Sequence, residues 1–488
     1  MKVVMATSEM VPFAKTGGLA DVSGALPKYL EQNGVEVCVF MPLYKKVKDK
    51  NIALTDTGIR VDVKLDETVR TAKIFESPLP GGKGKVYFVA NDESFDREEL
   101  YGTPYGDYPD NAARFVLFSR AVIEAVIRMD MHVDVFHVHD WQTALIPVYL
   151  KTIYSGKVKG DPGVLMTIHN LAYQGVFWHW DMKITGLSWE LFNWRQLEFF
   201  GKLNFLKGGI VFADAINTVS PTYAKEIQTS EYGCGLQEVL RYRSDKLFGI
   251  INGIDYSEWD PSLDEHIYCK FGPDNLNNKG RNKNSLRKDM GLDVKAKVPL
   301  IGMISRLADQ KGLDIIAEML DELLAEDVQM VFLGTGEKSY QDMLSDFERR
   351  YPNKVSANIM FNNTLAHRIE AGSDIFLMPS RYEPCGLNQL YSLRYGTLPI
   401  VRRTGGLADT IVDATPANIE AGTATGFVFD DYSSKALLDT CRRALKLYSN
   451  RMVWQKMVRT AMAQDWSWDN SARQYAELYN EIRSWKER

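Results

Sequence analysis

The eight residues Lys15–Val22 (KTGGLADV) return almost unchanged as Arg403–Thr410 (RTGGLADT) near the other end of the chain. In each copy a cation precedes a Gly-Gly pair, and a helix-compatible run follows. Backbone around a glycine pair can come close to a ligand, and the N–H groups that open a helix attract anions. One copy is ordinary loop chemistry, but two copies in opposite halves predict a protein whose halves close on one anionic ligand.

Outward from the first copy, the N-terminal half alternates short apolar runs with longer periodic segments. The pattern predicts a helix up to Gly34 and a series of strands and helices after it. The predicted strands are Val3–Ala6, Val35–Met41, Ile59–Leu65, Thr71–Glu76, Lys85–Ala90, Val133–Val138, Val164–Ile168 and Ala215–Val219, and the further helices are Asn111–Met129 and Trp141–Tyr154. This alternation is typical of a parallel α/β sheet.

The C-terminal half repeats the alternation after a polar stretch, Asp274–Lys297, which we interpret as a linker. Its predicted strands are Leu300–Ile304, Val328–Leu333, Ile375–Met378 and Pro399–Val401, and its helices are Leu313–Ala325, three that follow Gly386, Gly406 and Ser434, and Asp469–Trp485. We therefore expect an α/β protein with two Rossmann-like, doubly wound domains, over residues 1–250 and 251–465, and a terminal helix over 466–488.

Composition narrows the class of protein. The 488 residues are 45% hydrophobic and 25% charged, which is ordinary for globular domains. A net charge of −5 argues against binding to nucleic acid or to an anionic membrane. Five scattered cysteines fit a reducing compartment, and neither a signal peptide nor a membrane span is visible. A cytoplasmic protein that binds no nucleic acid and no membrane is expected.

Two cations follow the predicted strand Leu300–Ile304. Arg306 and Lys311 leave the strand end together, just before a predicted helix. Arg can grip phosphate oxygens in a fork, while Lys supplies a point charge. A solvated loop with two ordinary surface cations is the alternative, but ligands of doubly wound sheets bind beyond the strand ends. We expect a phosphate site here.

The strand Ile375–Met378 runs into a rigid turn, Pro379–Leu387, which contains Glu383. Pro384 and Gly386 favour a turn into a helix, so free N–H groups should follow the carboxylate. Such a carboxylate can meet a developing cation or hold sugar hydroxyls. The alternative is that Glu383 neutralises Arg381 or stabilises the start of the helix.

Polar residues also end two strands of the N-terminal half, in the stretches Phe136–Trp141 and Met166–Leu171. His137 and His139 have a spacing that can ligate metal, but a hydrogen-bonded structural pair is the commoner arrangement. The sequence has no Asp-x-Asp, so it gives no sign of a metal-bridged diphosphate site. Three aromatic residues in polar, loop-like surroundings are candidates for stacking on sugar rings: Tyr105, Trp141 and Trp180.

Several stretches are long enough to be specific. They are KTGGLADV at 15–22, HDW at 139–141, HNLAYQG at 169–175, NGID at 252–255, SRLADQKG at 305–312, YEPCGL at 382–387 and YGTLPIVRRTGGLADT at 395–410. Together they resemble the bacterial glycogen synthases and plant starch synthases, retaining transferases of the GT-B fold. Many retaining GT-B enzymes carry a second Glu eight positions after the first. Here that position is Tyr391, which follows the synthase branch.

The resemblance implies two domains facing across a cleft: residues 1–250 on the acceptor side, residues 251–465 for the nucleotide-sugar, and a terminal helix returning to the first domain. It implies a hexosyltransferase that passes glucose from ADP-glucose, or another nucleotide-glucose, to the non-reducing end of an α-1,4-glucan. The catalytic residues carried over are Glu383, Arg306, Lys311, His169 and Asp140. The donor-binding residues are Lys15, Gly17, Gly18, Arg306, Lys311, Cys385, Gly386, Leu387, Thr404, Gly405 and Gly406. Tyr105 and Trp141 are the expected acceptor contacts.

No cofactor and no metal are expected, because fixed cations and amides can stabilise the leaving diphosphate. Two other functions stay open from the residues. One is a related retaining glycosyltransferase with a sucrose or lipid acceptor, and the other is a non-catalytic glucan-binding scaffold. The joint presence of Lys15, Arg306, Lys311 and Glu383 argues against a scaffold.

Overall fold

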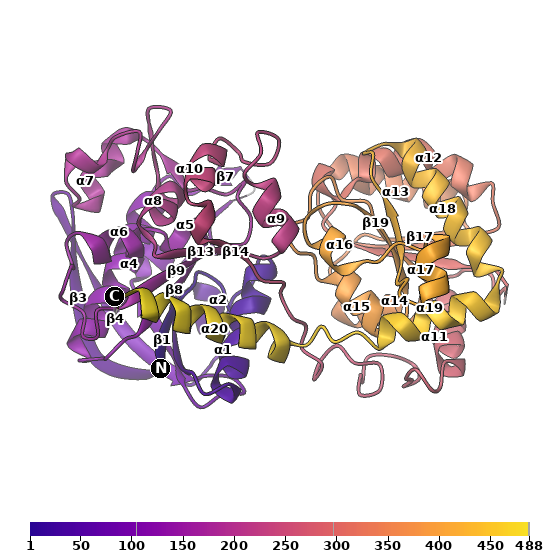
Figure 1. Ribbon diagram of the computed structural model, residues 1–488, viewed down its shortest axis with the longest axis horizontal. Coiled ribbons are helices and arrows are strands. Elements are labelled where there is room, and N and C mark those ends of the chain that lie inside the picture. Colours follow the sequence, from indigo (N-terminus) through magenta and orange to yellow (C-terminus); the bar gives the residue numbers. More distant parts are fainter. Residues whose placement is uncertain (104, 296, 487–488) are drawn as a thin grey trace. The chain divides into compact units, whose positions relative to one another are not determined.

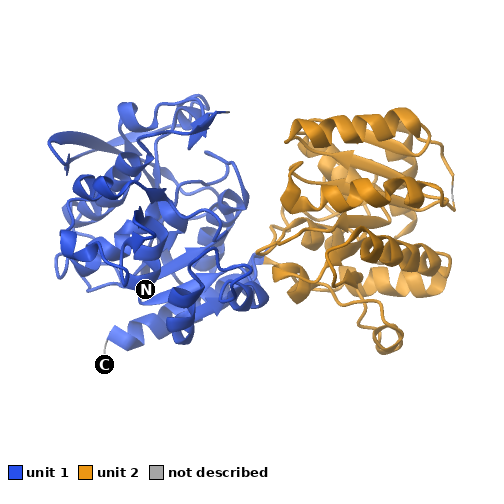
Figure 2. Ribbon diagram, turned by 90° about the horizontal axis from the view of Figure 1, so that it is seen from above, with its two compact units in different colours: residues 1–253, 468–488 blue, residues 254–467 orange. Residues whose placement is uncertain are grey.

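The computed structural model describes residues 1–103, 105–295 and 297–486, which form two compact units (Figures 1 and 2). Unit 1 comprises Met1–Gly253 and Trp468–Arg488, and unit 2 comprises Ile254–Ser467. The borders predicted from the sequence were 250 and 465. No helix among the described residues combines the length and the apolar character that crossing a membrane requires.

Unit 1 is built on a nine-stranded sheet of order β14-β13-β9-β8-β1-β2-β5-β4-β3. Its strands are β1 (Lys2–Ala6), β2 (Glu36–Pro42), β3 (Thr55–Leu65), β4 (Thr68–Pro78), β5 (Lys85–Ala90), β8 (Val135–His139), β9 (Gly163–Ile168), β13 (Ala215–Thr218) and β14 (Leu247–Gly249). All neighbours are parallel except β3 with β4 and β4 with β5. The buried runs of β1, β8 and β9 explain why these strands read as continuously apolar.

The helices of unit 1 pack on this sheet. They are α1 (Gly18–Gln32), α2 (Lys45–Lys48), α3 (Asp92–Phe95), α4 (Asn111–Arg128), α5 (Asp140–Thr143), α6 (Leu145–Lys151), α7 (Met182–Thr185), α8 (Phe205–Phe212), α9 (Pro221–Glu226), α10 (Gln237–Tyr242) and α20 (Trp468–Lys486). Unit 1 also contains three 3-10 helices: η1 (His179–Asp181), η2 (Trp189–Leu191) and η3 (Ser244–Lys246). Two small sheets belong to it as well. One pairs β6 (Gly102–Thr103) with β7 (Gly106–Asp107), and the other contains β10 (Val176–Phe177), β11 (Glu198–Phe199) and β12 (Lys202–Asn204).

The terminal helix α20 belongs to unit 1, as the fold prediction required (Figure 1). It packs beside α1 and against β8 and β9. Its Tyr479 hydroxyl lies 2.8 Å from Nδ1 of His137, and its Tyr475 hydroxyl accepts a hydrogen bond from Asn217 at 3.0 Å. Buried polar groups are normally hydrogen-bonded, so these contacts fix the helix to the sheet.

Unit 2 contains a six-stranded, wholly parallel sheet of order β17-β16-β15-β18-β19-β20. Its strands are β15 (Leu300–Ile304), β16 (Gln329–Leu333), β17 (Val355–Asn358), β18 (Ile375–Met378), β19 (Leu398–Arg402) and β20 (Phe427–Phe429). Its helices are α11 (Asn277–Asp289), α12 (Leu313–Leu324), α13 (Lys338–Arg350), α14 (Asn363–Gly372), α15 (Asn388–Arg394), α16 (Gly405–Thr410), α17 (Pro416–Ala421), α18 (Ser434–Tyr448) and α19 (Arg451–Met462), with the 3-10 turn η4 (Asp309–Lys311).

The interpretation of Asp274–Lys297 as a linker is wrong, because α11 occupies its centre and packs on α14. Three of its polar residues, Asn282, Lys283 and Arg287, are buried with hydrogen-bonding partners, which the local sequence does not indicate. Lys283 Nζ lies 2.5 Å from Asp374 and donates to the carbonyl oxygen of Val298 at 2.7 Å. Arg287 donates to the same carbonyl oxygen at 2.6 Å. The helix is therefore part of unit 2.

The predicted helix Trp141–Tyr154 is also wrong in detail, because it divides into α5 and α6 at Ala144 and ends at Lys151. Pro147 explains the division. It has no N–H to donate to the carbonyl group four residues earlier, and proline is tolerated only in the first turn of a helix. A new helix therefore begins shortly before it.

Candidate functional site

A buried carboxylate stands at the carboxyl edge of the unit 2 sheet. Glu383 follows β18, and its side chain is 9% exposed. Its Oε2 lies 2.5 Å from Lys311 Nζ and accepts a hydrogen bond from Ser380 Oγ at 3.0 Å. Arg381 pairs with Asp314 at 2.8 Å, so the alternative in which Glu383 neutralises Arg381 is wrong. The structure instead pairs the predicted carboxylate with a predicted phosphate-binding cation.

The backbone holds the turns after β15 and β18 against each other. Gly312, which follows Lys311, has a φ of +76°, and a β-carbon there would lie 2.2 Å from the carbonyl oxygen of Pro379. The N–H of Arg381 donates to the carbonyl oxygen of Gln310 at 2.8 Å. Only glycine combines this conformation with this approach. The Lys311–Glu383 pair is thereby fixed by the main chain as well as by charge.

The second Gly-Gly pair packs against the same Glu383 turn. A β-carbon on Gly405 would lie 1.9 Å from the carbonyl oxygen of Glu383, and one on Gly406 would lie 2.2 Å from that of Cys385. The Gly406 N–H donates to the carbonyl oxygens of Glu383 and Pro384 at 3.2 and 3.1 Å. These glycines therefore allow two turns to interlock, and the Gly406 amide is directed to the protein rather than to a phosphate.

Several donors at this edge are unengaged. Within the part of the chain that the structure describes, neither Gly386 nor Leu387 donates its backbone N–H to a protein group. Gly386 has a φ of +74°, which turns the chain into α15. Arg306 is exposed and makes no hydrogen bond or ion pair with a described residue. Two amides and a guanidinium are thus available to an anion. The donor contacts of Arg306, Cys385, Gly386, Leu387, Thr404 and Gly405 stay predictions.

In unit 1 the first Gly-Gly loop has different surroundings. No heavy atom lies within 4 Å of a β-carbon placed on Gly17 or Gly18, so this loop is open. The backbone N–H groups of Thr16 and Gly17 donate to the Glu9 carboxylate at 2.5 and 3.1 Å. Lys15 pairs with Asp21 at 2.6 Å on the surface. The Gly17 amide therefore binds a carboxylate of the protein itself, while Lys15 and Gly18 remain the predicted donor contacts of this loop.

Asp140 and His169 lie together at the carboxyl ends of β8 and β9. The backbone N–H of His169 donates to Asp140 Oδ1 at 2.7 Å, and its ring Nε2 lies 3.0 Å from His139 Nδ1. Burial, reinforced by the nearby Glu9 carboxylate, raises the pKa of Asp140 to about 7. Burial lowers the pKa of His169 to about 3, so its imidazole is neutral near pH 7. Near pH 7 the pair therefore offers a neutral imidazole and a carboxyl group that is close to its pKa.

The other histidine of the strand end is structural. His137 Nε2 lies 2.7 Å from Thr167 Oγ1, and its Nδ1 lies 2.8 Å from the Tyr479 hydroxyl. Among residues 1–103, 105–295 and 297–486, no three His, Cys, Asp or Glu side chains are placed to share a metal ion. His137 thus fixes α20 to the sheet.

The surroundings predicted for Trp141 are wrong. The indole lies on α5, is 8% exposed, and packs on the rings of Phe115 and Phe177 at 4.9 and 5.6 Å. A β-carbon on Gly175 would lie 2.5 Å from it. Trp141 therefore packs in the core beside the end of β8, while its acceptor contact stays a prediction. Tyr105 is fully exposed, and its acceptor contact stays a prediction.

Sequence reasoning missed two residues at these edges. Glu9 is 4% exposed and accepts a hydrogen bond from the Tyr101 hydroxyl at 2.8 Å, so it ties the first Gly-Gly loop to the unit 1 core. A carboxylate just beyond a strand end was the available signal. Phe361 follows β17 at the carboxyl edge of the unit 2 sheet and is 87% exposed. Only the structure separates this ring from the many core aromatic residues.

Tyr391, which stands where other retaining enzymes have a second Glu, is part of a three-ring stack. Its ring and that of His367 lie on Trp259, each with ring centroids 3.8 Å apart and planes 9° apart. Tyr391 belongs to α15, which begins at the Glu383 turn. Tyr391 therefore packs on Trp259, whereas a carboxylate at this position would not make the ring contact.

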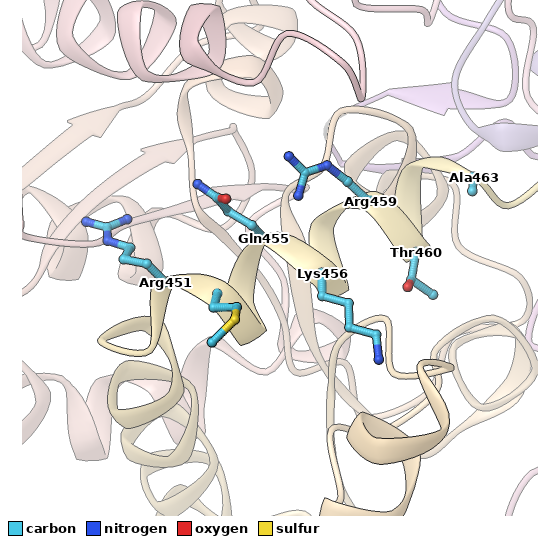
Figure 3. Close-up of a pocket in the computed structure, with 7 residues that line it drawn as sticks. Arg451, Gln455, Lys456, Arg459, Thr460 and Ala463 are labelled. Carbon is cyan, nitrogen blue, oxygen red and sulfur yellow. The ribbon is translucent and has the colours of Figure 1, made fainter.

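A surface hollow of about 710 Å³ runs along α19 and contains none of the predicted site residues (Figure 3). It is lined by Arg451, Met452, Gln455, Lys456, Arg459, Thr460 and Ala463. Figure 3 shows Arg459 and Lys456 projecting to opposite sides of the helix. The side chains do not converge on one point, so the hollow is not a second candidate for the chemistry.

Comparison with known families identifies both halves of the chain. Residues 2–242 match the family model described as the starch synthase catalytic domain. Residues 286–460 match the model of the group 1 glycosyl transferases. The two matches fall in unit 1 and unit 2 respectively.

Curated relatives and solved structures are similar over the whole length. A glycogen synthase of Koribacter versatilis is 48% identical over 99% of this chain and 98% of its own. One of Thermotoga maritima is 47% identical over 98% of each chain. The catalytic domain of starch synthase IV from Arabidopsis thaliana, bound to ADP and acarbose, aligns over 99% of both chains with 33% identity and a TM-score of 0.89. A sucrose-phosphate synthase of Thermosynechococcus elongatus, 15% identical over 99% of both chains with a TM-score of 0.60, shares the fold.

Proposed function

The chain belongs to the glycogen and starch synthase family of glycosyltransferases and has its two-domain GT-B fold, and from this premise we propose how its own residues act. It is a hexosyltransferase of the glycogen or starch synthase type. We propose that the donor is ADP-glucose and the acceptor the non-reducing end of an α-1,4-glucan, with retained configuration. The Arabidopsis starch synthase that was solved with ADP and acarbose supports this choice of substrates. The cytoplasmic location stays a prediction from the sequence.

The observation that carries the proposal is the buried Lys311–Glu383 pair at the edge where Arg306 and two amides are free. Breaking a glucose–phosphate bond leaves negative charge on the diphosphate and positive charge on the sugar. Groups held in place before the reaction stabilise such charges without reorganising. Lys311 and Arg306 would meet the diphosphate, and the Gly386 and Leu387 amides would meet oxygen atoms of the donor.

We propose that Glu383 positions glucose and steadies its positive charge without forming a covalent bond. Its carboxylate is held by Lys311 and Ser380, so it is anchored rather than free to attack. A nucleophile must lie beneath the anomeric carbon, on the face opposite the leaving group. Retention would then follow from attack on the same face that the diphosphate leaves.

On the acceptor side, Asp140 and His169 would hold sugar hydroxyl groups. A neutral imidazole has one donor and one acceptor nitrogen, which suits a hydroxyl group. A carboxyl with a pKa near 7 can accept or donate a hydrogen bond near neutral pH. Lys15 would approach the same diphosphate from unit 1. For the nucleobase, the exposed ring of Phe361 offers a stacking surface on the edge of the donor sheet.

A donor panel tests the proposal. The purified chain is incubated with glycogen and either ADP-glucose or UDP-glucose, and the released nucleoside diphosphate is measured. We expect ADP release to exceed UDP release, and Glu383→Gln to slow both. Phe361→Ala should weaken ADP binding while Phe199→Ala, an aromatic change in unit 1, should not. If neither ADP-glucose nor UDP-glucose releases its nucleoside diphosphate, the catalytic assignment is refuted.

A further inference from the structure

Three histidine rings lie in a row at the carboxyl ends of β8 and β9. The ring centroids of His137 and His139 are 4.1 Å apart, and those of His139 and His169 are 5.2 Å apart. His137 and His139 are fully buried, whereas His169 is partly exposed. His139 therefore stands between a ring that is fixed in the core and the ring that the proposed function assigns to a sugar hydroxyl group. We call the three rings the histidine row.

The middle ring of the row is held in place from several sides. The backbone N–H of His139 donates to Thr143 Oγ1 at 2.7 Å, and the Thr143 hydroxyl donates to the His139 carbonyl oxygen at 2.7 Å. The ring packs on His137, which the terminal helix α20 holds from the other side (Figure 1). Its Nδ1 lies 3.0 Å from His169 Nε2. The contact between the two rings is therefore fixed by main-chain and side-chain groups together.

These contacts leave His169 a single ring nitrogen for a ligand. Its backbone N–H is bound to Asp140 Oδ1, and its Nε2 lies against His139. Among residues 1–103, 105–295 and 297–486, none forms a hydrogen bond with Nδ1 of His169. A sugar hydroxyl group can therefore meet this ring only at Nδ1. Whether that nitrogen donates or accepts depends on where the ring carries its proton.

The contact between His139 and His169 uses one proton. Burial lowers the pKa of His169 to about 3 and holds the pKa of His139 well below its ordinary value, so both rings are neutral near pH 7. A neutral imidazole has one N–H and one bare nitrogen. Either His139 donates from Nδ1 to His169, or His169 donates from Nε2 to His139. The first arrangement puts the His169 proton on Nδ1, and the second leaves Nδ1 bare.

The far side of the His139 ring decides between the two arrangements. Its Nε2 is buried and has no hydrogen-bonding partner in the part of the chain that the structure describes. If His139 accepted the bond from His169, its own proton would lie on this Nε2 without an acceptor. Buried N–H groups without an acceptor are rarer than buried acceptors without a donor, and each costs the desolvation of the donor. The proton of His139 therefore belongs on Nδ1.

We propose that His139 is a positioning residue that makes His169 a hydrogen-bond donor to a sugar oxygen. His139 donates to Nε2 of His169 and thereby keeps the His169 proton on Nδ1, the nitrogen that is left for the ligand. This inference rests on the proposed function, in which His169 meets a sugar hydroxyl group, and it fixes the direction of that hydrogen bond. His139 itself, buried behind His169, does not touch the sugar.

Two substitutions of nearly equal size separate the hydrogen bond from the packing. In His139→Asn the amide nitrogen can take the place of Nδ1 and donate to His169, whereas His139→Leu has no donor. We expect kcat/KM for ADP-glucose with glycogen to be roughly tenfold lower in His139→Leu than in His139→Asn, the effect of losing one hydrogen bond. The control is His132→Asn, which should leave activity unchanged because the His132 side chain is 58% exposed and lies outside the histidine row.

The position of the proton can be measured without any reaction. The chain has seven histidines, and nitrogen-15 NMR of the labelled rings distinguishes protonated from bare nitrogens. The signals of His169 are those that disappear in His169→Asn. We expect the His169 proton on Nδ1 in the wild type and in His139→Asn, and a shift of the proton towards Nε2 in His139→Leu.

Two outcomes would overturn the inference. A His169 proton on Nε2 in the wild type at pH 7 would refute the assigned direction, even if neither variant of His139 folds. Equal kcat/KM in His139→Leu and His139→Asn would show that the bond to His169 does not matter for the reaction. Failure of the proposed function is distinct, because the wild type would then transfer glucose from neither nucleotide sugar while the NMR signals still report the proton.

Discussion

The sequence predicts the same phosphate-binding role for Lys311 and Arg306, but the structure predicts that removing each of them has different consequences. Lys311→Ala leaves the Glu383 carboxylate, which is 9% exposed, with the hydrogen bond that Ser380 donates to it. Removing one partner of a buried ion pair costs about 3–5 kcal/mol. The Lys311 side chain is 16% exposed, so residual solvation reduces the loss to roughly 2–3 kcal/mol of unfolding free energy.

Arg306→Ala removes an exposed side chain that has no hydrogen-bonding or ion-pair partner among the described residues, so stability should change by no more than about 0.5 kcal/mol. Both changes remove a charge that would face the leaving diphosphate. Each should therefore lower kcat on the order of a hundredfold, as the loss of one preorganised charge-assisted contact does. The structure thus predicts equal losses of activity and unequal losses of stability.

Urea unfolding and ADP release with glycogen measure the two quantities separately. A double variant, Lys311→Ala with Glu383→Gln, removes the unpaired charge. It should recover part of the stability without recovering activity, because neither catalytic charge returns. Equal urea midpoints for Lys311→Ala and Arg306→Ala would refute the buried-pair argument. Near-normal turnover in both variants would refute the diphosphate assignment.

Three further predictions follow from the same site. Glucan extension should continue at close to the untreated rate in excess EDTA, and loss of activity that added magnesium or manganese restores would contradict this. Glu383→Ala should lose most turnover yet bind ADP nearly normally, while Glu383→Gln keeps more activity; a glucosyl adduct on Glu383 in mass spectrometry would favour double displacement instead. Because the folded-state pKa of Asp140 is raised to about 7 from an ordinary 3.8, the stability associated with its protonated form is complete below pH 4 and is lost as pH rises through 7. Urea unfolding at pH 5 and pH 8 should therefore show Asp140→Asn gaining on the wild type as pH rises, by up to about 3 kcal/mol between these two pH values, and a constant difference would show that the carboxyl is not perturbed.

The central strands of the sheets were predictable because they are buried on both faces. Leu300–Ile304 and Ile375–Met378 were predicted with the bounds that the structure has. Runs of this kind are apolar at every position, so neither the face nor the register has to be known. The edges of the sheets were predictable for a related reason. Polar residues directly after such runs must lie where parallel strands end. This rule predicted Asp140, His169 and Glu383 as candidate site residues.

The remaining features depended on contacts that one-dimensional patterns do not contain. The helix α11 reads as a polar linker, since Lys283 pairs with Asp374 far along the chain and Arg287 donates to the carbonyl oxygen of Val298 beyond the helix. Trp141 reads as a loop residue, since its packing partners Phe115 and Phe177 come from α4 and β10. In both cases local polarity was a correct observation. Burial was decided by residues that the local sequence does not show.

The two copies of the octapeptide show why a repeated motif does not imply a repeated role. In the second copy, the glycines are required because the Glu383 turn occupies the space of their β-carbons. In the first copy that space is empty, and Glu9 holds the amides instead. The first loop therefore has space around its glycines, whereas the second is packed against the Glu383 turn. We infer that the first loop would respond to the donor, and that the second keeps the carboxylate and its lysine in position.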